Sequence, residues 1–283
     1  MTGAHPDGGT LDAASVPIVS WVIPVLNEEA QLPDSVPRLS AALNGISVLK
    51  NRWEIVIADN GSTDGTNEIG LRLARVEDHV RYLRLQQSGR GRALRRAWAQ
   101  SASPVLAYSD VDLSTDLRHV PELLDAVLRG GFDLALGSRL AGGSETSRGL
   151  GREILSRGYN GLARLILGTQ VRDLQCGFKA IKREAASLLL PLVESERWFF
   201  DTELVVLAEA ADFRLREVAV RWTDDPDTRV RLLPTIVEDL RGLARLRYQL
   251  RRKAGVAKSM RAKEAQVPGS LGGTAVVLNG RHR

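Results

Sequence analysis

Short apolar segments alternate with helical patterns over the first half of the chain, and this alternation limits the possible folds more than any other feature. Four segments have the length and apolar content of buried strands: 18–24, 53–58, 80–85 and 104–108. Apolar residues recur at helical spacing near 32–49, 66–76, 92–100 and 120–129. Strands that alternate with helices are typical of a mostly parallel sheet with helices on both faces. The sequence therefore predicts an α/β fold.

Two carboxylates follow the fourth strand. Asp110 and Asp112 lie one residue apart, directly after the apolar run 104–108. Because residues i and i+2 of a strand share a face, both carboxylates can converge on one hard cation. Mg²⁺ and Mn²⁺ typically take one or two protein carboxylates and complete their coordination with water and phosphate oxygens. The spacing predicts a metal–diphosphate site, and the competing interpretation is a pair of solvated loop acids.

Polar loops also follow the first three strands. Asn27 and Glu28 follow the first strand, the run 59–66 follows the second, and the run 88–93 follows the third. Ligands of open α/β sheets bind at the carboxyl ends of the strands. Backbone N–H groups that precede a helix can also bind phosphate. We therefore expect three loops to converge on one edge of the sheet.

The run 89–94 is not a dinucleotide-binding fingerprint. That motif needs three glycines directly after the first strand and an acidic residue roughly 20 positions later. Here the run comes late, and Leu94 stands where the third glycine would be. Arg90 and Arg92 would instead offset the negative charge of a phosphate group. Serine hydrolysis is also excluded, because no nucleophile-elbow serine with a histidine partner is visible.

Seven motifs, taken in order, resemble family 2 of the inverting, nucleotide-sugar-dependent glycosyltransferases with the GT-A fold. The likeness is strongest to the polyprenyl-phosphate (dolichyl-phosphate) hexosyltransferases. The motifs together span most of residues 17–245 and occupy 23–29, 59–66, 89–93, 110–113, 137–139, 173–180 and 197–204. The resemblance implies a Rossmann-like, mostly parallel sheet with helices on both faces, followed by C-terminal amphipathic helices.

The resemblance also implies a nucleotide-sugar donor and a divalent cation, Mg²⁺ or Mn²⁺. It makes Asp110 and Asp112 the metal-binding and catalytic aspartates, with Ser114 as a candidate third ligand. Polyprenyl-phosphate mannosyltransferases often carry a glutamine after the two aspartates, whereas Leu113 and Ser114 follow here, so the third ligand stays open. The implied donor-binding residues are Pro24, Asn27, Glu28, Asp59, Gly61, Arg90, Gly91, Arg92 and Asp110.

The implied acceptor is a polyprenyl phosphate, held by arginines among Arg139, Arg152 and Arg157. Guanidinium groups bind phosphate oxygens bidentately, although each arginine individually also fits an ordinary surface position. A phosphate acceptor is already ionised near pH 7, because its second pKa is about 6, and it needs no strong general base. A hydroxyl acceptor would need one, and Asp201 and Glu203 are the candidates in that case.

The C-terminal half of the chain is more similar to dolichyl-phosphate glucosyltransferases, which favours UDP-glucose over GDP-mannose as the donor. Two alternatives stay open. One is a family 2 transferase that acts on a sugar or other hydroxyl. The other is a non-catalytic, membrane-associated binding module, which the retention of both aspartates and of the Asp59 loop disfavours, because such a module needs no metal to neutralise a diphosphate.

Basic residues are concentrated at the C-terminal end. From Arg241 onward the sequence contains eleven basic residues and one acidic residue, Glu264, whereas the net charge of the whole chain is +5. Helical spacing of apolar residues predicts a basic amphipathic helix on anionic lipid, where each nearby cation contributes about 1 kcal/mol. A core-packing helix with a solvated outer face is the alternative. Nucleic-acid binding is disfavoured, because the tail has few aromatic residues to stack on bases.

A second apolar stripe, interrupted by arginines, lies in 152–167.

The predicted organisation has four parts: a flexible arm at 1–16, a catalytic domain at 17–230, the basic helix at 231–253 and a disordered basic tail at 254–283. We also expect a mobile loop at 142–151. No stretch of about 18 apolar residues is present, so no transmembrane helix is expected. The single cysteine, Cys176, excludes an intramolecular disulfide and fits a reducing cytoplasm. These features predict a cytoplasmic enzyme bound peripherally to the inner face of the membrane.

Overall fold

The structure, a computed structural model, describes residues 16–147, 149–223 and 232–266. Its centre is a seven-stranded sheet with the order β3-β2-β1-β4-β7-β5-β8. All strands run parallel except β7, which is antiparallel to both of its neighbours. The strands are β1 (Val19–Val25), β2 (Trp53–Asp59), β3 (Val80–Arg84), β4 (Val105–Ser109), β5 (Leu134–Ser138), β7 (Phe178–Lys182) and β8 (Leu215–Ala219). The predicted mostly parallel sheet is confirmed.

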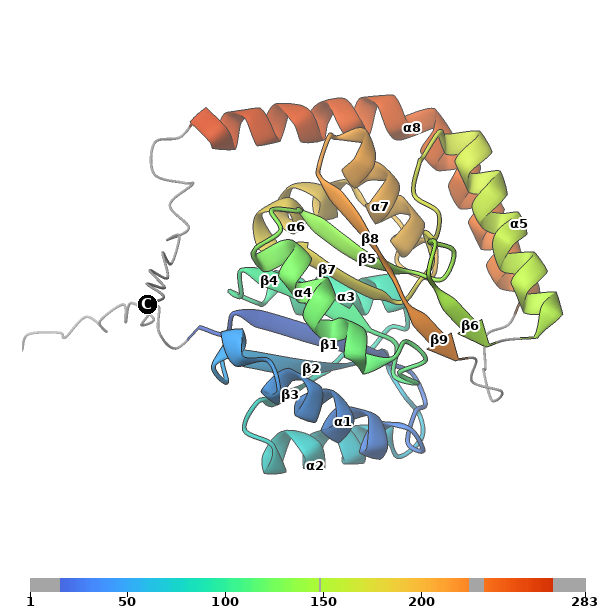
Figure 1. The fold of residues 1–283 in the computed structure, drawn as a ribbon. Helices are drawn as coiled ribbons and strands as arrows, with labels where there is room; N and C mark the ends of the chain where they lie inside the picture. Colours follow the sequence, from blue (N-terminus) through green and yellow to red (C-terminus); the bar gives the residue numbers. More distant parts are fainter. Residues whose placement is uncertain (1–15, 148, 224–231, 267–283) are drawn as a thin grey trace, which may run out of the picture.

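Both faces of the sheet are buried, as the continuous apolar strands predict. Successive residues of a strand enter opposite layers: Trp21 and Ile23 belong to one apolar cluster, and Val22 belongs to the other. The first layer is completed by α1 (Leu32–Asn44), α2 (Thr66–Val76) and α4 (Val120–Leu128). The second is completed by α3 (Arg90–Ala99), α5 (Leu150–Leu167), α6 (Arg183–Leu189), α7 (Phe200–Ala210) and α8 (Leu232–Gln266). Figure 1 shows this arrangement of helices around the sheet.

The order of the strands creates one switch point, between β1 and β4. From β1 the chain builds outward through β2 to β3, and it then returns to place β4 on the other side of β1. Ligands of open α/β sheets bind at such a point, beside the carboxyl ends of the strands. The loops after β1, β2 and β4 therefore meet at one edge, as the polar runs in the sequence predict.

The segment expected to be a mobile loop contains a short strand. β6 (Glu145–Ser147) pairs in parallel with β9 (Arg221–Thr223), and the two form a separate small sheet. An ion pair between Arg221 and Glu145 supports this pairing. The small sheet leads directly into α5, which runs beside the first part of α8 (Figure 1).

Helix α8 is longer than the sequence predicts. It continues to Gln266, so the prediction of a disordered tail from residue 254 is wrong for 254–266. The physical reason is packing by small residues, because Ala254 and Ala257 are buried against the core although they give little apolar periodicity. No helix within 16–147, 149–223 and 232–266 is long and apolar enough to span a membrane. The expected arm at 1–16 lies almost entirely outside the described residues, as does the tail from 267.

Candidate functional site

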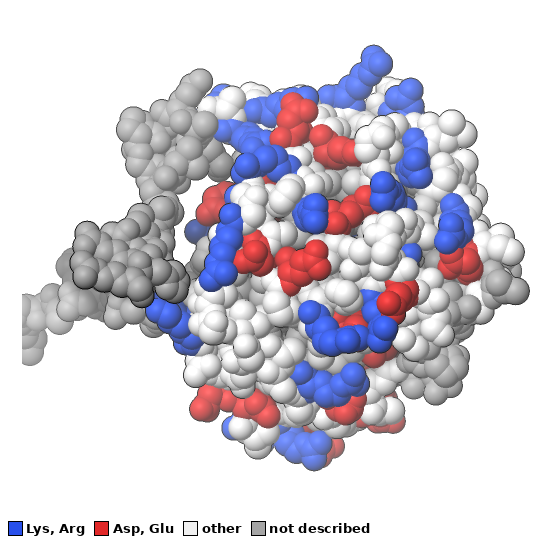
Figure 2. All heavy atoms as spheres, viewed as in Figure 1, with Lys and Arg blue, Asp and Glu red and all other residues white. Residues whose placement is uncertain are grey.

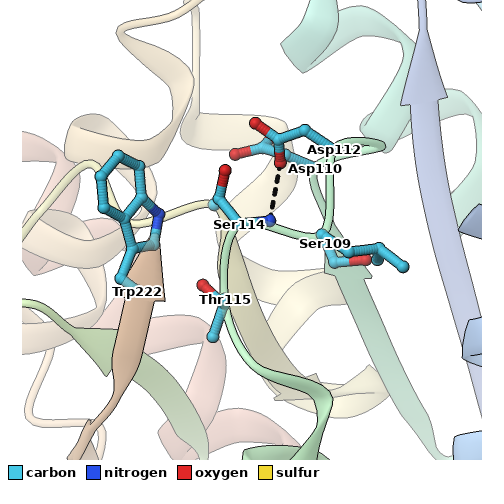
Figure 3. Close-up of a pocket in the computed structure, with 8 residues that line it drawn as sticks. Ser109, Asp110, Asp112, Ser114, Thr115 and Trp222 are labelled. Carbon is cyan, nitrogen blue, oxygen red and sulfur yellow. Dashed lines mark hydrogen bonds between the residues drawn. The ribbon is translucent and has the colours of Figure 1, made fainter. Parts of the chain in front are cut away.

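A small pocket opens at the end of β4, where the sequence places the paired aspartates. In Figure 3 the carboxylates of Asp110 and Asp112 lie together, and the hydroxyl of Ser114 points to the same side. The loop turns sharply at Leu113, whose φ is 48°, and the backbone N–H of Ser114 donates to Asp112 Oδ1 at 3.0 Å. The residues that line the pocket are Ser109, Asp110, Asp112, Leu113, Ser114, Thr115, Gly177 and Trp222.

Gly177 explains why Asp110 can occupy this position. Its carbonyl accepts a hydrogen bond from the Asp110 backbone N–H at 3.1 Å. A Cβ on Gly177 would lie only 1.7 Å from Asp110 Oδ2, so no larger residue fits without displacing the carboxylate. The antiparallel pairing of β7 with β4 brings the two segments together. The motif at 173–180 therefore forms one wall of the pocket.

The oxygen ligands in this pocket fit a hard divalent cation. Two carboxylates and one hydroxyl converge, and oxygen atoms are the ligands that Mg²⁺ and Mn²⁺ prefer. Ser114 Oγ is buried and has no hydrogen-bond partner among the described residues, which suits a ligand or a ligand-bound water. The described part of the chain contains no group of three or more His, Cys, Asp or Glu side chains that could hold a metal. Two carboxylates are sufficient where phosphate oxygens complete the coordination.

Arg90 binds the first of these aspartates from behind. Its Nε and Nη2 donate to Asp110 Oδ1 at 3.2 and 2.6 Å, and its Nη1 donates to Asp201. The guanidinium is buried and lies 5.2 Å from the ring centroid of Trp198. Arg90 is thus fixed between two carboxylates at the start of α3.

The carboxylate of Asp201 accepts hydrogen bonds from three side chains. In addition to Arg90, the Tyr108 hydroxyl and Lys179 Nζ, the latter at 2.9 Å, donate to its carboxylate, which is 2% exposed. Burial alone would raise the pKa of Asp201, but Lys179 and Arg90 outweigh burial and hold it below its ordinary value. A carboxylate held in this way is a poor proton acceptor. These contacts hold Arg90 and Lys179 in place, and they disfavour Asp201 as the general base considered for a hydroxyl acceptor.

Glu203 has a different role, two residues further along α7. Its fully buried carboxylate accepts from Ser195 N at 2.8 Å, Arg245 Nη2 at 3.0 Å and Lys253 Nζ at 2.8 Å. Arg245 and Lys253 both belong to α8. Glu203 does not line the carboxylate pocket. It fastens α8 to the catalytic domain, so the role of general base does not fit its position.

The loops after β1 and β2 are cross-linked into one wall, next to Pro24 in β1. The Asn27 backbone N–H donates to Ser62 Oγ at 2.9 Å, and the Glu28 backbone N–H donates to Thr66 Oγ1 at 2.8 Å. Gly61 has a φ of 82°, which side-chain-bearing residues rarely adopt. The loops that carry Asn27, Glu28 and Gly61 are therefore held together by hydrogen bonds.

Asp59 anchors this wall from below. It is fully buried and accepts from Ser62 N at 2.8 Å and from the Tyr82 hydroxyl. Burial and the neighbouring Asp59 carboxylate raise the pKa of Tyr82 well above its usual range. Tyr82 was not identified from the sequence, because only the pairing of β2 with β3 brings it to Asp59.

Arg92 and Gly91 shape the start of α3. Arg92 Nη1 donates to Ser88 O at 2.8 Å, and its Nη2 pairs with Glu196. Gly91 allows α3 to approach α7 closely, because a Cβ there would lie 2.6 Å from Phe200 Cβ. This glycine therefore serves helix packing, which in turn sets the position of Arg90.

The three arginines expected to hold an acceptor phosphate are not equivalent. Arg139 is tied to the fully buried Asp173, with Nε and Nη2 donating at 2.7 and 2.8 Å. Arg157 lies exposed on α5 and pairs with Glu153 one turn away. Arg152 lies in the first turns of α5, and its side chain is outside the described part of the structure. Arg157 and Arg152 share one helix, whereas Arg139 is engaged in the interior.

Besides Tyr82, four residues of the site escaped sequence reasoning: Gly177, Lys179, Tyr108 and Trp222. Gly177 and Lys179 lie in the motif at 173–180, but the sequence pattern alone assigns no role to either residue. Trp222 reaches the pocket only because β9 pairs with the loop after Asp112. Each of these contacts depends on strands that are far apart in the sequence.

The chain is similar in sequence to known glycosyltransferases. The chain matches the family described as glycosyl transferase family 2 over residues 20–190. It is 40% identical to glycosyltransferase AglD of Haloferax volcanii over 220 residues, which cover 77% of this chain but only 35% of AglD. It is 32% identical to the dolichyl-phosphate beta-glucosyltransferase of Drosophila melanogaster, over 73% of this chain and 67% of that protein. The chain thus spans about a third of the length of AglD.

Solved structures support the fold. Glucosyl-3-phosphoglycerate synthase from Mycobacterium tuberculosis in complex with UDP superimposes with a TM-score of 0.60 and 22% identity, covering 89% of this chain and 87% of that chain. The same synthase with Mn²⁺ and UDP-glucose gives a TM-score of 0.58 and 21% identity over 84% of this chain and 79% of that chain. This likeness identifies the GT-A fold. Because the family match covers more than half of the chain and includes every pocket residue except Trp222, the chain belongs to glycosyl transferase family 2.

Proposed function

We propose that this glycosyltransferase moves a hexose from a nucleotide sugar to a polyprenyl phosphate at a membrane surface, with UDP-glucose favoured over GDP-mannose as the donor. The observation that carries the proposal is the pocket after β4, where two carboxylates and an unpartnered buried hydroxyl converge. The names of the relatives support the acceptor, because several are dolichyl-phosphate beta-glucosyltransferases. The UDP-glucose complex of the solved neighbour supports the donor.

Asp110 and Asp112 would hold a Mg²⁺ or Mn²⁺ ion, with Ser114 bound directly or through water. When bound, such a cation supplies positive charge that stabilises the diphosphate leaving group by several kcal/mol. Arg90 keeps Asp110 oriented from the opposite side through two hydrogen bonds. The preorganised carboxylate pair therefore loses little freedom when the donor binds.

In the transfer, a phosphate oxygen of the acceptor forms a bond to the anomeric carbon as the bond from that carbon to the diphosphate oxygen breaks. The acceptor phosphate is already ionised near neutral pH, because its second pKa is about 6. No general base is required, in agreement with Asp201 and Glu203 being occupied by cationic partners. A hydroxyl acceptor would need a base, and both candidates lack the exposure for that role.

The surface formed by α5 and α8 supports attachment to a membrane. Exposed apolar side chains on these two adjacent helices are Ile154, Leu155, Leu162, Leu165, Val237, Leu240 and Tyr248. Arg241, Arg247 and Arg251 lie exposed on the same stretch of α8. In Figure 2 basic side chains also project along the upper margin, where the later part of α8 runs in Figure 1, beyond its contact with α5. Apolar residues flanked by arginines suit the interface of anionic lipids.

Arg157, and Arg152 from the same helix, are the acceptor-phosphate candidates that this surface favours. Arg157 is exposed on α5, and its ion pair with Glu153 is a surface pair worth about 0–1 kcal/mol. A lipid phosphate can therefore compete for it. Arg139 would need to leave a buried carboxylate, which costs far more.

The experiment that tests the proposed function is an acceptor competition. The purified chain is given UDP-glucose or GDP-mannose, Mn²⁺, and an equimolar mixture of a short polyprenyl phosphate and the corresponding polyprenol. We expect the phosphate to be glycosylated and the alcohol to be ignored. Glycosylation of the alcohol, or of an added sugar hydroxyl with the phosphate untouched, would show the acceptor class to be wrong.

A further inference from the structure

We infer that Trp222 is the platform on which the transferred hexose lies, an inference that rests on the proposed function. Trp222 is the aromatic residue among those that line the carboxylate pocket. In Figure 3 its indole stands across the pocket from Asp110 and Asp112, with the ring nitrogen on the side of Ser114.

The position follows from the chemistry of the donor. In a nucleotide sugar the hexose is joined directly to the terminal phosphate, so it lies one linkage from any cation that binds the diphosphate. A cation at Asp110 and Asp112 therefore brings the hexose to the part of the pocket that Trp222 lines. Aromatic rings offer a large apolar face for the C–H groups of a pyranose, and the indole N–H is a donor for a sugar hydroxyl. Ligand sites commonly combine an aromatic wall with a few polar groups in this way.

The backbone on both sides of Trp222 is tied to the aspartate loop. Thr223 N donates to Ser114 O at 2.9 Å, and Asp116 N donates to Arg221 O at 3.0 Å. Thr115 and Trp222 form an isolated antiparallel bridge between these two hydrogen bonds. These contacts fix the backbone of Trp222 relative to the aspartate loop.

The plane of the indole is set by Arg139. The Arg139 Cζ lies 5.4 Å from the centroid of the Trp222 ring, within the range of a cation–π contact. The guanidinium is itself held by Asp173, which is fully buried. Asp173 belongs to the same motif as Gly177, which adjoins Asp110. One motif thus supports both the carboxylate and, through Arg139, the aromatic wall of the pocket.

The test compares binding of a nucleotide sugar with binding of the bare nucleotide. Wild type, Trp222→Leu and the more conservative Trp222→Phe are titrated with UDP-glucose and UDP, and with GDP-mannose and GDP, in the presence of Mn²⁺ and without lipid. Phe132→Leu, in the segment between α4 and β5, is the matched loss of an aromatic residue outside the pocket. Calorimetry gives the dissociation constants, and tryptophan fluorescence gives a second readout.

We expect Trp222→Leu to weaken binding of the nucleotide sugar by about tenfold, in keeping with the loss of one aromatic contact. The dissociation constant of the bare nucleotide should change little. The effect of Trp222→Phe should fall between those of wild type and Trp222→Leu, and Phe132→Leu should match wild type. The fluorescence change that the sugar adds to that of the nucleotide should vanish in Trp222→Phe. Unchanged nucleotide binding also reports that each variant is folded.

Equal weakening of nucleotide and nucleotide sugar, or no change in either, would overturn the role of Trp222 and leave the proposed transferase intact. If the wild-type chain binds neither nucleotide sugar, the proposed function itself fails, and this inference fails with it.

Discussion

Arg90 holds one carboxylate oxygen of Asp110 through two of its nitrogens, at 3.2 and 2.6 Å. The contact joins the start of α3 to the end of β4, and it places a buried guanidinium directly behind the carboxylate pocket. The third nitrogen of Arg90 is bound by Asp201 from α7. The two groups that matter most for a diphosphate, the carboxylate pair and a fixed positive charge, are thus assembled from three separate elements.

The first prediction concerns the proposed cation. Asp112→Asn keeps the shape of the side chain and removes one negative charge, so transfer should fall by at least about a hundredfold, equivalent to several kcal/mol of lost stabilisation. Mn²⁺-dependent binding of the donor should weaken in parallel when it is measured by calorimetry. Asp116→Asn is the matched control, because Asp116 lies in the same loop but pairs with Arg118 outside the pocket. Full turnover in Asp112→Asn would show that Asp110 and Asp112 do not hold a catalytic cation.

The second prediction separates positioning from base catalysis at Asp201. Asp201→Asn should lower kcat by about ten- to a hundredfold, because Arg90 and Lys179 lose the charge that fixes them. The shape of the kcat–pH profile should not change, since Asp201 does not exchange a proton with the acceptor. The profile is measured for wild type and variant with the same polyprenyl phosphate. If kcat rises with pH on the acidic side of the profile in wild type but not in the variant, Asp201 is the general base.

The third prediction concerns stability and pH at Asp239, on the buried face of α8. Gln175 Nε2 donates to its Oδ2 at 2.9 Å, Oδ1 has no hydrogen-bond partner in the described ranges, and burial raises the pKa of Asp239 to about 7. The folded state therefore holds a proton that the unfolded chain releases near pH 4. This group lowers stability as pH rises from about 4 to 7, and the loss is complete above that range.

Asp239→Asn removes that titration and keeps an oxygen for Gln175. We expect its Tm to exceed that of wild type at about pH 8 and to match it more closely at about pH 4.5. Asp125→Asn, at an exposed position on α4, is the control and should show no such trend. A variant that is less stable than wild type at about pH 8 would mean that Asp239 is ionised and paired in the folded protein.

The fourth prediction concerns the α5–α8 surface. Sedimentation with liposomes should require anionic lipid and should decrease at high ionic strength, because salt screens the arginine contribution. Leu165→Ser should weaken sedimentation, since its side chain is 82% exposed on α5. Val76→Ser on α2, which removes a side chain 70% exposed elsewhere on the molecule, should leave it unchanged. Equal effects of the two substitutions would contradict a specific membrane-binding face.

The sequence predicts those parts of the site that depend on local pattern. Asp110 and Asp112 follow an apolar strand at i, i+2 spacing, and this spacing alone locates the pocket. The pairing of Arg90 with Asp201 joins residues 111 positions apart and depends on α7 packing beside α3, which periodicity does not encode. Likewise, the end of α8 was misplaced because small residues such as Ala257 can pack closely without making an apolar stripe.

The most direct test of the account is the structure of the product formed from UDP-glucose, whose sugar is α-linked, and a short polyprenyl phosphate. Mass spectrometry and NMR of the purified lipid should identify a β-linked glucosyl phosphodiester. It should be formed with Mn²⁺ by the wild-type chain and be absent with Asp112→Asn. An α-linked product, or an Asp112→Asn variant that forms the product at the wild-type rate, would contradict inverting transfer at the Asp110–Asp112 pocket.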